Sequence, residues 1–319
     1  MNREWYLNLT KKTPEEADIL KYWTTENSRP LVSICCATYN QENYIEDAII
    51  GFLSQKTSFP FEIIINDDAS TDSTLDVILQ YASKYPNIIK VNTHRENQYS
   101  RGVKPVRDIL IPQAKGKYIA LCEGDDYWTA SDKLEKQVKA LEEKETCNIC
   151  FSAGEALYAN GRKEPLAVHG LDVVHYEVGD VVSGGGGFMP TASIMVRNVK
   201  EIIERLHKID SPVGDVVLQI LFSYEGGAIF IPEKMVTYRV MSVGSWSSSR
   251  SLEERLKHRI KMLKTYNQIA NMYPILAQQL SRTSRNAFYA DMKVSIKKKD
   301  TLTFIKLLII YFRSVFSRG

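Results

Sequence analysis

Residues 122–128 read Cys-Glu-Gly-Asp-Asp-Tyr-Trp and place three carboxylates within four positions. Like charges this close repel one another, so their presence together needs a physical reason. Carboxylates at Glu123 and Asp125, two positions apart on a turn, can converge on a hard cation that prefers oxygen ligands. Magnesium or manganese bound in this way is usually completed by waters and substrate phosphates. An isolated acidic turn can also be solvated at the surface or cap a helix. Its place in the fold therefore decides between these alternatives and a metal site.

A second acidic pair, Asp67-Asp68, precedes the polar run Ala69-Ser70-Thr71-Asp72. Ser, Thr and Asp are common at helix starts, so capping explains part of this run. Two adjacent aspartates cannot both serve one cap. One of them is available to accept a hydrogen bond from a ligand, such as the N–H of a nucleotide base.

The elements that would position these residues alternate along the first half of the chain. Apolar runs of strand length at 31–38, 61–67, 87–93 and 117–123 are separated by helical patterns at 44–55, around 75–82 and at 104–114. This order predicts a parallel sheet with helices on its faces. Ligands of such sheets bind beyond the carboxyl ends of the strands. Polar residues follow three of these strands, at 38–40, 67–68 and 123–126, so we expect one site at that edge.

The second half is less regular. We expect helices at 133–144, at 199–209 and from 214, and strands at 149–158, 173–178 and 191–198. Residues 228–240 predict one or two strands broken by Pro232, and the four glycines in 183–188 predict a flexible segment. Beyond 250 the pattern is that of basic helices. The predicted organisation is an N-terminal helical segment (1–30), an α/β catalytic domain (31–250, divided into 31–128 and 129–250) and a helical extension (251–319).

Composition narrows the class of protein. The chain has 319 residues, a net charge of +3 and a pI near 8.4, which is too mildly basic to indicate a nucleic-acid partner. Five cysteines, an odd number, and an N-terminus without an apolar segment predict a reducing, cytoplasmic setting. The lone Cys147-x-x-Cys150 pair is interpreted as two half-buried thiols.

In their order and spacing, five segments resemble family 2 glycosyltransferases, the large inverting group with the GT-A fold. They are residues 32–55, 62–74, 114–128, 190–198 and 214–226, within a resemblance that covers roughly 31–240. The resemblance implies one Rossmann-like mixed sheet flanked by helices. It also implies a metal-dependent hexosyl- or N-acetylhexosaminyl-transferase that moves a sugar from a nucleotide-diphosphate donor. Among such donors, a UDP-sugar is favoured. The acceptor would be a hydroxyl of a glycan or lipid-linked oligosaccharide in surface polysaccharide synthesis.

The resemblance also assigns roles to the acidic clusters. Asp125 and Asp126 would hold Mn²⁺ or Mg²⁺ on the diphosphate, and Asp68 would bond the base, with Asp67 beside it. Glu123 stands where an aspartate is commoner in the family.

Further residues are carried over by position. Tyr39 would pack near the base, Ala37 stands where many relatives carry a hydroxyl or a proline, and Arg107 matches an arginine that faces the nucleotide. Asp215, at the start of a predicted helix, matches the general base, although the residues alone favour a helix N-cap at this position.

After Tyr238-Arg239, residues 242–247 (Ser-Val-Gly-Ser-Trp-Ser) resemble the family's mobile segment. Met241 stands where many relatives have a histidine, and Trp246 would stack on the sugar or pack in the core.

The implied reaction is a single displacement. An acceptor hydroxyl attacks the anomeric carbon, Asp215 takes its proton, and attack opposite the leaving diphosphate inverts the configuration. One alternative is a sugar-nucleotide nucleotidyltransferase, but residues 37–44 lack the glycine-rich, arginine-bearing loop that it would need. Another is a non-catalytic nucleotide-sugar-binding module, against which the presence of both acidic sets argues. A dehydrogenase would need G-x-G-x-x-G after the first strand.

The C-terminal residues 291–319 hold seven basic side chains against two acidic ones, around the apolar stretch 302–312. A basic helix with a strong apolar face suits the surface of an anionic membrane. The same face could instead dock on the enzyme's own core or form a homodimer interface. We expect peripheral contact with the inner face of the cytoplasmic membrane, through a segment too short to span it.

Overall fold

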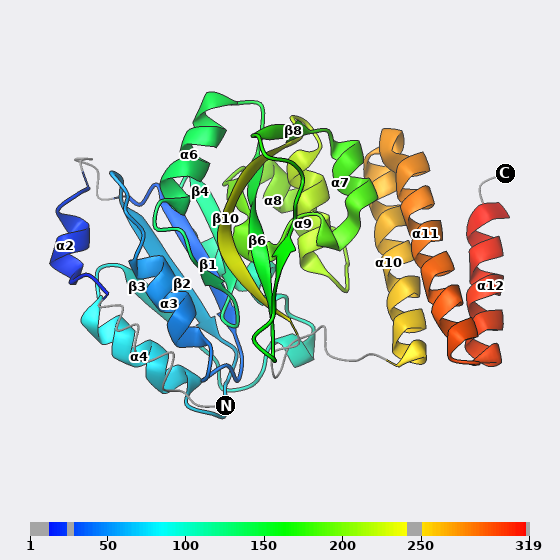
Figure 1. Cartoon of the computed structure of the whole chain (residues 1–319), viewed down its shortest axis with the longest axis horizontal. Coiled ribbons are helices and arrows are strands. Elements are labelled where there is room, and N and C mark those ends of the chain that lie inside the picture. The colour runs from blue at the N-terminus through cyan, green and yellow to red at the C-terminus, as the bar shows by residue number, and fades with distance from the viewer. Residues whose placement is uncertain (1–12, 24–28, 241–250, 317–319) are drawn as a thin grey trace.

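The computed structural model describes residues 13–23, 29–240 and 251–316. A mixed ten-stranded sheet organises this part of the chain, with the strand order β3-β2-β1-β4-β9-β6-β10-β5 (Figure 1). Strand β7 pairs with β6, and β8 pairs with β10. Figure 1 shows helices on both faces of the sheet and three further helices stacked at one end.

The first half supplies the parallel part of the sheet. Its strands are β1 (Val32–Thr38), β2 (Phe61–Asp67), β3 (Ile89–Thr93) and β4 (Tyr118–Glu123). They are linked by α3 (Ile45–Leu53), by α4 (Thr74–Lys84), and by the π-helical segment η2 (Pro105–Leu110) with α5 (Ile111–Gln113). Thr38 pairs with Asp67, and Ala37 pairs with Glu123. The register therefore brings both acidic clusters to the end of β1, as the sequence predicts.

The second half completes the sheet with mixed pairing. Its strands are β5 (Tyr127–Trp128), β6 (Ile149–Tyr158), β7 (Lys163–Leu166), β8 (Val174–Tyr176), β9 (Met195–Arg197) and β10 (Ala228–Val240). Strand β9 is antiparallel to both β4 and β6, whereas β6 and β10 are parallel. The helices are α6 (Lys133–Glu143), α7 (Val178–Gly184), α8 (Lys200–His207) and α9 (Gly214–Ser223).

Successive apolar side chains of a strand point to opposite faces of the sheet and form one core on each face. Ile34 and Ile65 pack with α3 and α6 on one face, whereas Cys35 and Ile64 pack with α7, α8 and α9 on the other. Burial on both faces explains why these strands are continuous apolar runs.

Two predicted elements differ in detail. Within 191–198 only Met195–Arg197 is strand, because Thr191–Ser193 forms the short 3₁₀ turn η4 directly after Pro190. Strand β10 runs through Pro232, and the register with β6 shifts between Ile231 and Lys234. A bulge thus accommodates the missing N–H of proline without ending the strand.

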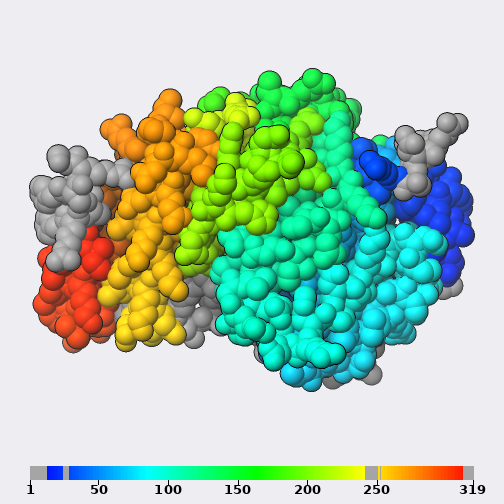
Figure 2. Space-filling view, turned by 180° about the vertical axis from the view of Figure 1, so that it is seen from behind, coloured from blue at the N-terminus to red at the C-terminus, as the bar shows by residue number. Residues whose placement is uncertain are grey.

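The C-terminal extension consists of α10 (Leu252–Met272), the turn η5 (Pro274–Leu276), α11 (Ala277–Lys297) and α12 (Thr301–Phe316). The Thr265 hydroxyl donates to the Asp210 carbonyl at 2.8 Å, and Arg205 Nη1 donates to the Tyr273 hydroxyl at 3.1 Å. In Figure 2 the yellow-to-orange surface of α10 accordingly adjoins the yellow-green surface of the preceding domain, and α12 lies at the outer end. Within the described ranges, every helix is too short or too polar to cross a bilayer.

Candidate active site

The acidic turn between β4 and β5 packs directly against the end of β1. The Gly124 N–H donates to the Ala37 carbonyl at 3.0 Å, and the Asp126 N–H donates to the Glu123 carbonyl at 3.1 Å. A Cβ at Gly124 would lie 2.5 Å from Gln41 Oε1 and 2.7 Å from Thr38 Oγ1. Only glycine fits this contact, which explains the residue type in the middle of the cluster.

Arg239, at the end of β10, braces this turn. Its N–H donates to Asp126 Oδ1 at 2.9 Å, and its Nη1 donates to the Asp125 carbonyl at 2.7 Å. Its Nη2 donates to Asp47 Oδ2 on α3, and the guanidinium lies 4.5 Å from the ring centroid of Tyr127. Asp126 is buried, and at least one of its carboxylate oxygens accepts a hydrogen bond from β10. A metal-ligand role for Asp126, which stays a prediction, therefore depends on its other oxygen.

The carboxylates of this turn oppose one another's ionisation. Glu123 meets solvent, yet protein atoms crowd its carboxyl, and this loss of solvation is the main reason why its pKa rises to about 8. The negative charges of Asp125 and Asp215 raise it further. Burial, followed by the charges of Asp125 and Glu123, likewise raises the pKa of Asp126, against the opposing effect of Arg239. Such a set favours a bound cation, because a positive charge removes the repulsion.

Asp215 comes to this turn from the second half of the chain. It lies in the first turn of α9, where its Oδ1 accepts from the Val216 N–H at 2.7 Å and its Oδ2 accepts from the Thr191 hydroxyl at 3.4 Å. Residue Val213 occupies the N-cap position, so Asp215 is not the cap. Burial raises the pKa of Asp215, and these two hydrogen bonds partly offset that effect. The Ala192 carbonyl, next to Thr191, accepts from Trp128 Nε1 at 2.9 Å, so the turn that bonds the predicted general base also contacts the strand directly after the acidic turn.

The pair Asp67-Asp68 ends β2 on the other side of β1. Asp68 Oδ1 accepts from the Gln98 N–H at 2.7 Å, and its Oδ2 accepts from the Tyr99 N–H at 2.9 Å. Asp67 Oδ2 accepts from the Ser70 N–H at 3.1 Å, whereas its buried Oδ1 has no hydrogen-bond partner in the described part of the chain. The geometry thus leaves one acceptor oxygen on Asp67. The predicted contact of Asp68 with the nucleotide base would require the backbone at 98–99 to move away from the Asp68 carboxylate.

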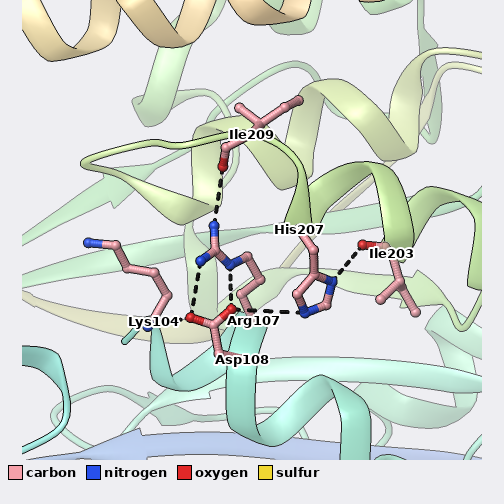
Figure 3. A network of polar contacts seen from close by, with 6 residues as sticks. All are labelled: Lys104, Arg107, Asp108, Ile203, His207 and Ile209. Atoms are coloured by element: carbon pink, nitrogen blue, oxygen red, sulfur yellow. Dashed lines mark hydrogen bonds and ion pairs between the residues drawn. The ribbon is translucent and has the colours of Figure 1, made fainter. Parts of the chain in front are cut away.

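The Arg107 side chain binds to protein groups of both halves of the fold. Figure 3 shows its guanidinium on Asp108 and on the carbonyl of Ile209, which follows α8. The two bonds to Asp108 measure 2.6 and 3.1 Å, and the bond to Ile209 measures 3.2 Å. Burial alone would raise the pKa of Asp108, but the bonds from Arg107 and from the Lys104 N–H outweigh it and hold this pKa below its usual value. In this structure Arg107 joins η2 to the second half of the fold, and its contact with the nucleotide stays a prediction.

The remaining predicted residues lie at or beyond the end of β1. Tyr39 is 40% exposed next to the Asp67-Asp68 pair, and Ala37 contributes the carbonyl that holds Gly124. Met241 and Trp246, together with the rest of 242–247, lie outside the described residues. Sequence reasoning missed the bond between Asp47 and Arg239 and the bond from Thr191 to Asp215, because each joins segments that are far apart in the sequence.

A cavity of about 550 Å³ lies at the opposite end of the sheet. Its lining includes Trp23, Pro60, Glu62 and Lys115, near the starts of β2 and β4, and none of the predicted site residues. The Glu62 carboxylate is already engaged, by Lys90, the Ser33 hydroxyl and the Lys115 N–H. The chemistry-bearing residues therefore gather at the carboxyl ends of the strands, away from this cavity.

The mixed sheet with helices on its faces and the C-terminal helices have the architecture of the GT-A fold. A solved structure of Staphylococcus aureus TarS (residues 1–349) in complex with UDP-GlcNAc superimposes with a TM-score of 0.69. It is 18% identical in sequence, and the match covers 89% of this chain and 81% of that one.

Residues 33–182 match the model of glycosyl transferase family 2, so this part of the chain is similar to that family. An uncharacterised protein of Mycobacterium tuberculosis is 35% identical over 223 residues, which are 68% of this chain and 61% of that protein. The putative teichuronic acid biosynthesis glycosyltransferase TuaG of Bacillus subtilis is 35% identical over 152 residues, 47% of this chain and 57% of TuaG. The chain thus spans less than two thirds of the length of these relatives.

Proposed function

We propose that the chain is an inverting glycosyltransferase that moves a sugar from a nucleotide-diphosphate donor, a UDP-sugar, to a hydroxyl of a glycan or lipid-linked acceptor. The observation that carries the proposal is the link between Asp215 and the acidic turn through residues 191–192: Thr191 bonds Asp215, and the Ala192 carbonyl accepts from Trp128, which follows the acidic turn. A non-catalytic binding module would not need the half-buried carboxylate of Asp215 in addition to the acidic turn that would hold the diphosphate.

The relatives support the donor and acceptor classes. The Escherichia coli protein WfaP is named as a UDP-Glc:alpha-D-GlcNAc-diphosphoundecaprenol beta-1,3-glucosyltransferase and is 38% identical over 112 residues, 35% of this chain and 41% of WfaP. The names of TuaG and WfaP, a teichuronic acid enzyme and one with a lipid diphosphate acceptor, make surface polysaccharide synthesis the proposed setting.

In the proposed reaction, the acceptor hydroxyl gives its proton to Asp215 as its oxygen bonds the anomeric carbon. The bond from that carbon to the diphosphate oxygen breaks, and the nucleoside diphosphate leaves with the bonding electron pair. Burial of Asp215 suits this role, because a raised pKa makes its carboxylate a stronger base. An α-linked donor sugar would yield a β-linked product.

The donor set of the acidic turn fits a divalent cation such as Mn²⁺ or Mg²⁺. All candidate ligand atoms are carboxylate oxygens, and burial together with the neighbouring negative charges raises the pKa of Glu123 and of Asp126. In the described ranges no three His, Cys, Asp or Glu side chains form a complete metal site, so donor phosphates would supply further ligands. Asp125 and Asp126 would hold the cation, which when bound neutralises charge on the departing diphosphate.

The proposal is tested by incubating the full chain with a panel of UDP-, GDP- and TDP-sugars and manganese, and measuring release of free nucleoside diphosphate. We expect one UDP-sugar to give release that ends on addition of EDTA and returns with excess Mn²⁺. A panel in which every donor stays intact, with and without lipid-linked acceptors, would contradict the proposed activity.

We further propose that α12 docks on an anionic membrane surface. Leu307 packs inward on α10 and α11, whereas Leu302, Ile305 and Ile309 on α12 and Ile296 on α11 are exposed by 47–64%. Five lysines belong to the same two helices and their connection: Lys293, Lys297, Lys298, Lys299 and Lys306. Apolar side chains beside lysines match the acyl boundary and the head groups of an anionic bilayer.

We expect the double variant Ile305→Ser/Ile309→Ser to sediment less with vesicles containing phosphatidylglycerol than the unchanged protein does, because it loses exposed apolar area. Ile275→Ser is the matched control, since Ile275 is 82% exposed but lies outside α12. Equal sedimentation of all three proteins would refute the docking surface. A change in oligomeric state by light scattering, instead of in vesicle binding, would show that this face is a dimer interface.

A further inference from the structure

We propose that α11 positions the side of the active site that carries the base, with Gln279 and Thr283 as the positioning residues. The contacts run to α7, whose last residue begins the glycine segment 184–187. Gln279 Nε2 donates to the Gly179 carbonyl at 2.6 Å and to the Ser183 hydroxyl at 3.0 Å. The Thr283 hydroxyl donates to the Val182 carbonyl at 3.2 Å. Both ends of α7 are thus attached to α11.

The glycine segment that follows α7 passes beside α9, the helix that carries the proposed general base. A Cβ on Gly186 would lie 3.1 Å from Val216 Cγ2, so the bare backbone passes next to the residue that follows Asp215. Gln219 Nε2 donates to the Met189 carbonyl at 3.2 Å, and the Thr191 hydroxyl reaches Asp215 Oδ2 at 3.4 Å. The chain between α7 and Thr191 is therefore held by α11 at its start and by α9 at its end.

The glycines make this connection dependent on its attachments. Gly185 has φ of +64°, and a Cβ on Gly185 or Gly187 would meet nothing within 4 Å. Backbone of this kind has high conformational entropy and no side chains to pack. Its position is then set by the clamps at either end rather than by the segment itself.

The rest of the extension supports α11 from behind. Asp291 on α11 is buried and accepts from Arg259 Nε at 2.6 Å and from Arg255 Nη1 at 3.4 Å, which ties α11 to α10. Tyr266 of α10 lies near the base: burial is the main cause of its raised pKa, and the charge of Asp215 contributes. The extension thus packs against the part of the site that carries Asp215. Asp67, Asp68 and the acidic turn lie at the ends of β2 and β4.

This division predicts which step depends on the clamp. In the proposed transfer reaction, a base that is displaced by about 1 Å can lose on the order of 10²-fold in rate. Loosening α7 would affect the approach of the acceptor hydroxyl to Asp215. The donor would still bind at the strand ends of the first half.

Gln279→Met removes the amide donor at nearly constant volume, and Gln278→Met changes the exposed neighbour as a matched control. We expect faster amide hydrogen exchange in residues 180–191 of Gln279→Met than in the unchanged protein, with β1 and β2 unaltered. We also expect roughly 10-fold lower kcat for transfer with an unchanged KM for the donor. Thr283→Val should give the same pattern more weakly.

Unchanged exchange at 180–191 in both Gln279→Met and Thr283→Val would overturn the inference, whatever the activity. Because the exchange measurement needs no substrate, it is independent of the proposed function. Faster exchange in a protein that transfers no sugar would uphold the clamp and refute the transferase proposal. If Gln278→Met lowered kcat as much as Gln279→Met does, the cause would be a general loss of helix packing. That result would also count against the clamp.

Discussion

Asp215→Asn is expected to lower the rate of sugar transfer by roughly 10²- to 10⁴-fold, the range that a positioned general base contributes. The amide oxygen of the asparagine can still accept the Val216 N–H, and its amide N–H can donate to the Thr191 hydroxyl oxygen, so the local structure should persist. What is lost is the ability to take the acceptor proton. The measurement is kcat for transfer with the donor identified by the panel, beside the affinity for the nucleoside diphosphate, which should be unchanged.

The pH dependence of the unchanged protein provides the control. Burial raises the pKa of Asp215, and only its unprotonated form is a base, so activity should fall as the pH falls through this raised pKa. The residual activity of Asp215→Asn should lack this acid limb. Full activity of the variant, or an acid limb that survives the substitution, would remove Asp215 from the role of base.

The regular part of the fold could be predicted because its signals are local. The runs 61–67 and 149–158 are strands with the expected bounds, since burial on both faces requires continuous apolar residues. Pro190 and the polar residues after it shortened the strand expected at 191–198, because a turn satisfies that backbone instead. At Pro232 the opposite occurred: the long pairing of β10 with β6 tolerated a bulge, which no local signal reveals.

The site could be predicted as far as strand ends determine it. Parallel strands place their carboxyl ends at one edge, so Asp67, Asp68 and the acidic turn had to come together. The partners of these side chains could not be predicted, because they come from distant segments: Arg239 for Asp126, and Ile209 for Arg107. The division of the chain at residue 250 stays a prediction, since α10 and α11 are bonded to the preceding domain.

The second large effect is expected at the acidic turn, where three substitutions separate ligand binding from bracing. Asp125→Asn should lower metal-dependent release of nucleoside diphosphate by at least about 10²-fold, because a carboxylate that neutralises the cation is lost. Asp126→Ala should lose activity and also about 1–3 kcal/mol of unfolding free energy, because the buried Arg239 N–H is left without its acceptor. Activity is measured against Mn²⁺ concentration, and stability by urea unfolding.

Asp126→Asn is the deciding variant. Its amide oxygen can still accept the Arg239 N–H, so the brace and the stability of the turn should remain. If Asp126 is a metal ligand, as the sequence predicts, this variant must still lose activity and require more Mn²⁺, as Asp125→Asn does. Full activity with an unchanged Mn²⁺ requirement would leave Asp126 as a brace only and give the metal to Asp125, with Glu123 as the remaining carboxylate of the turn.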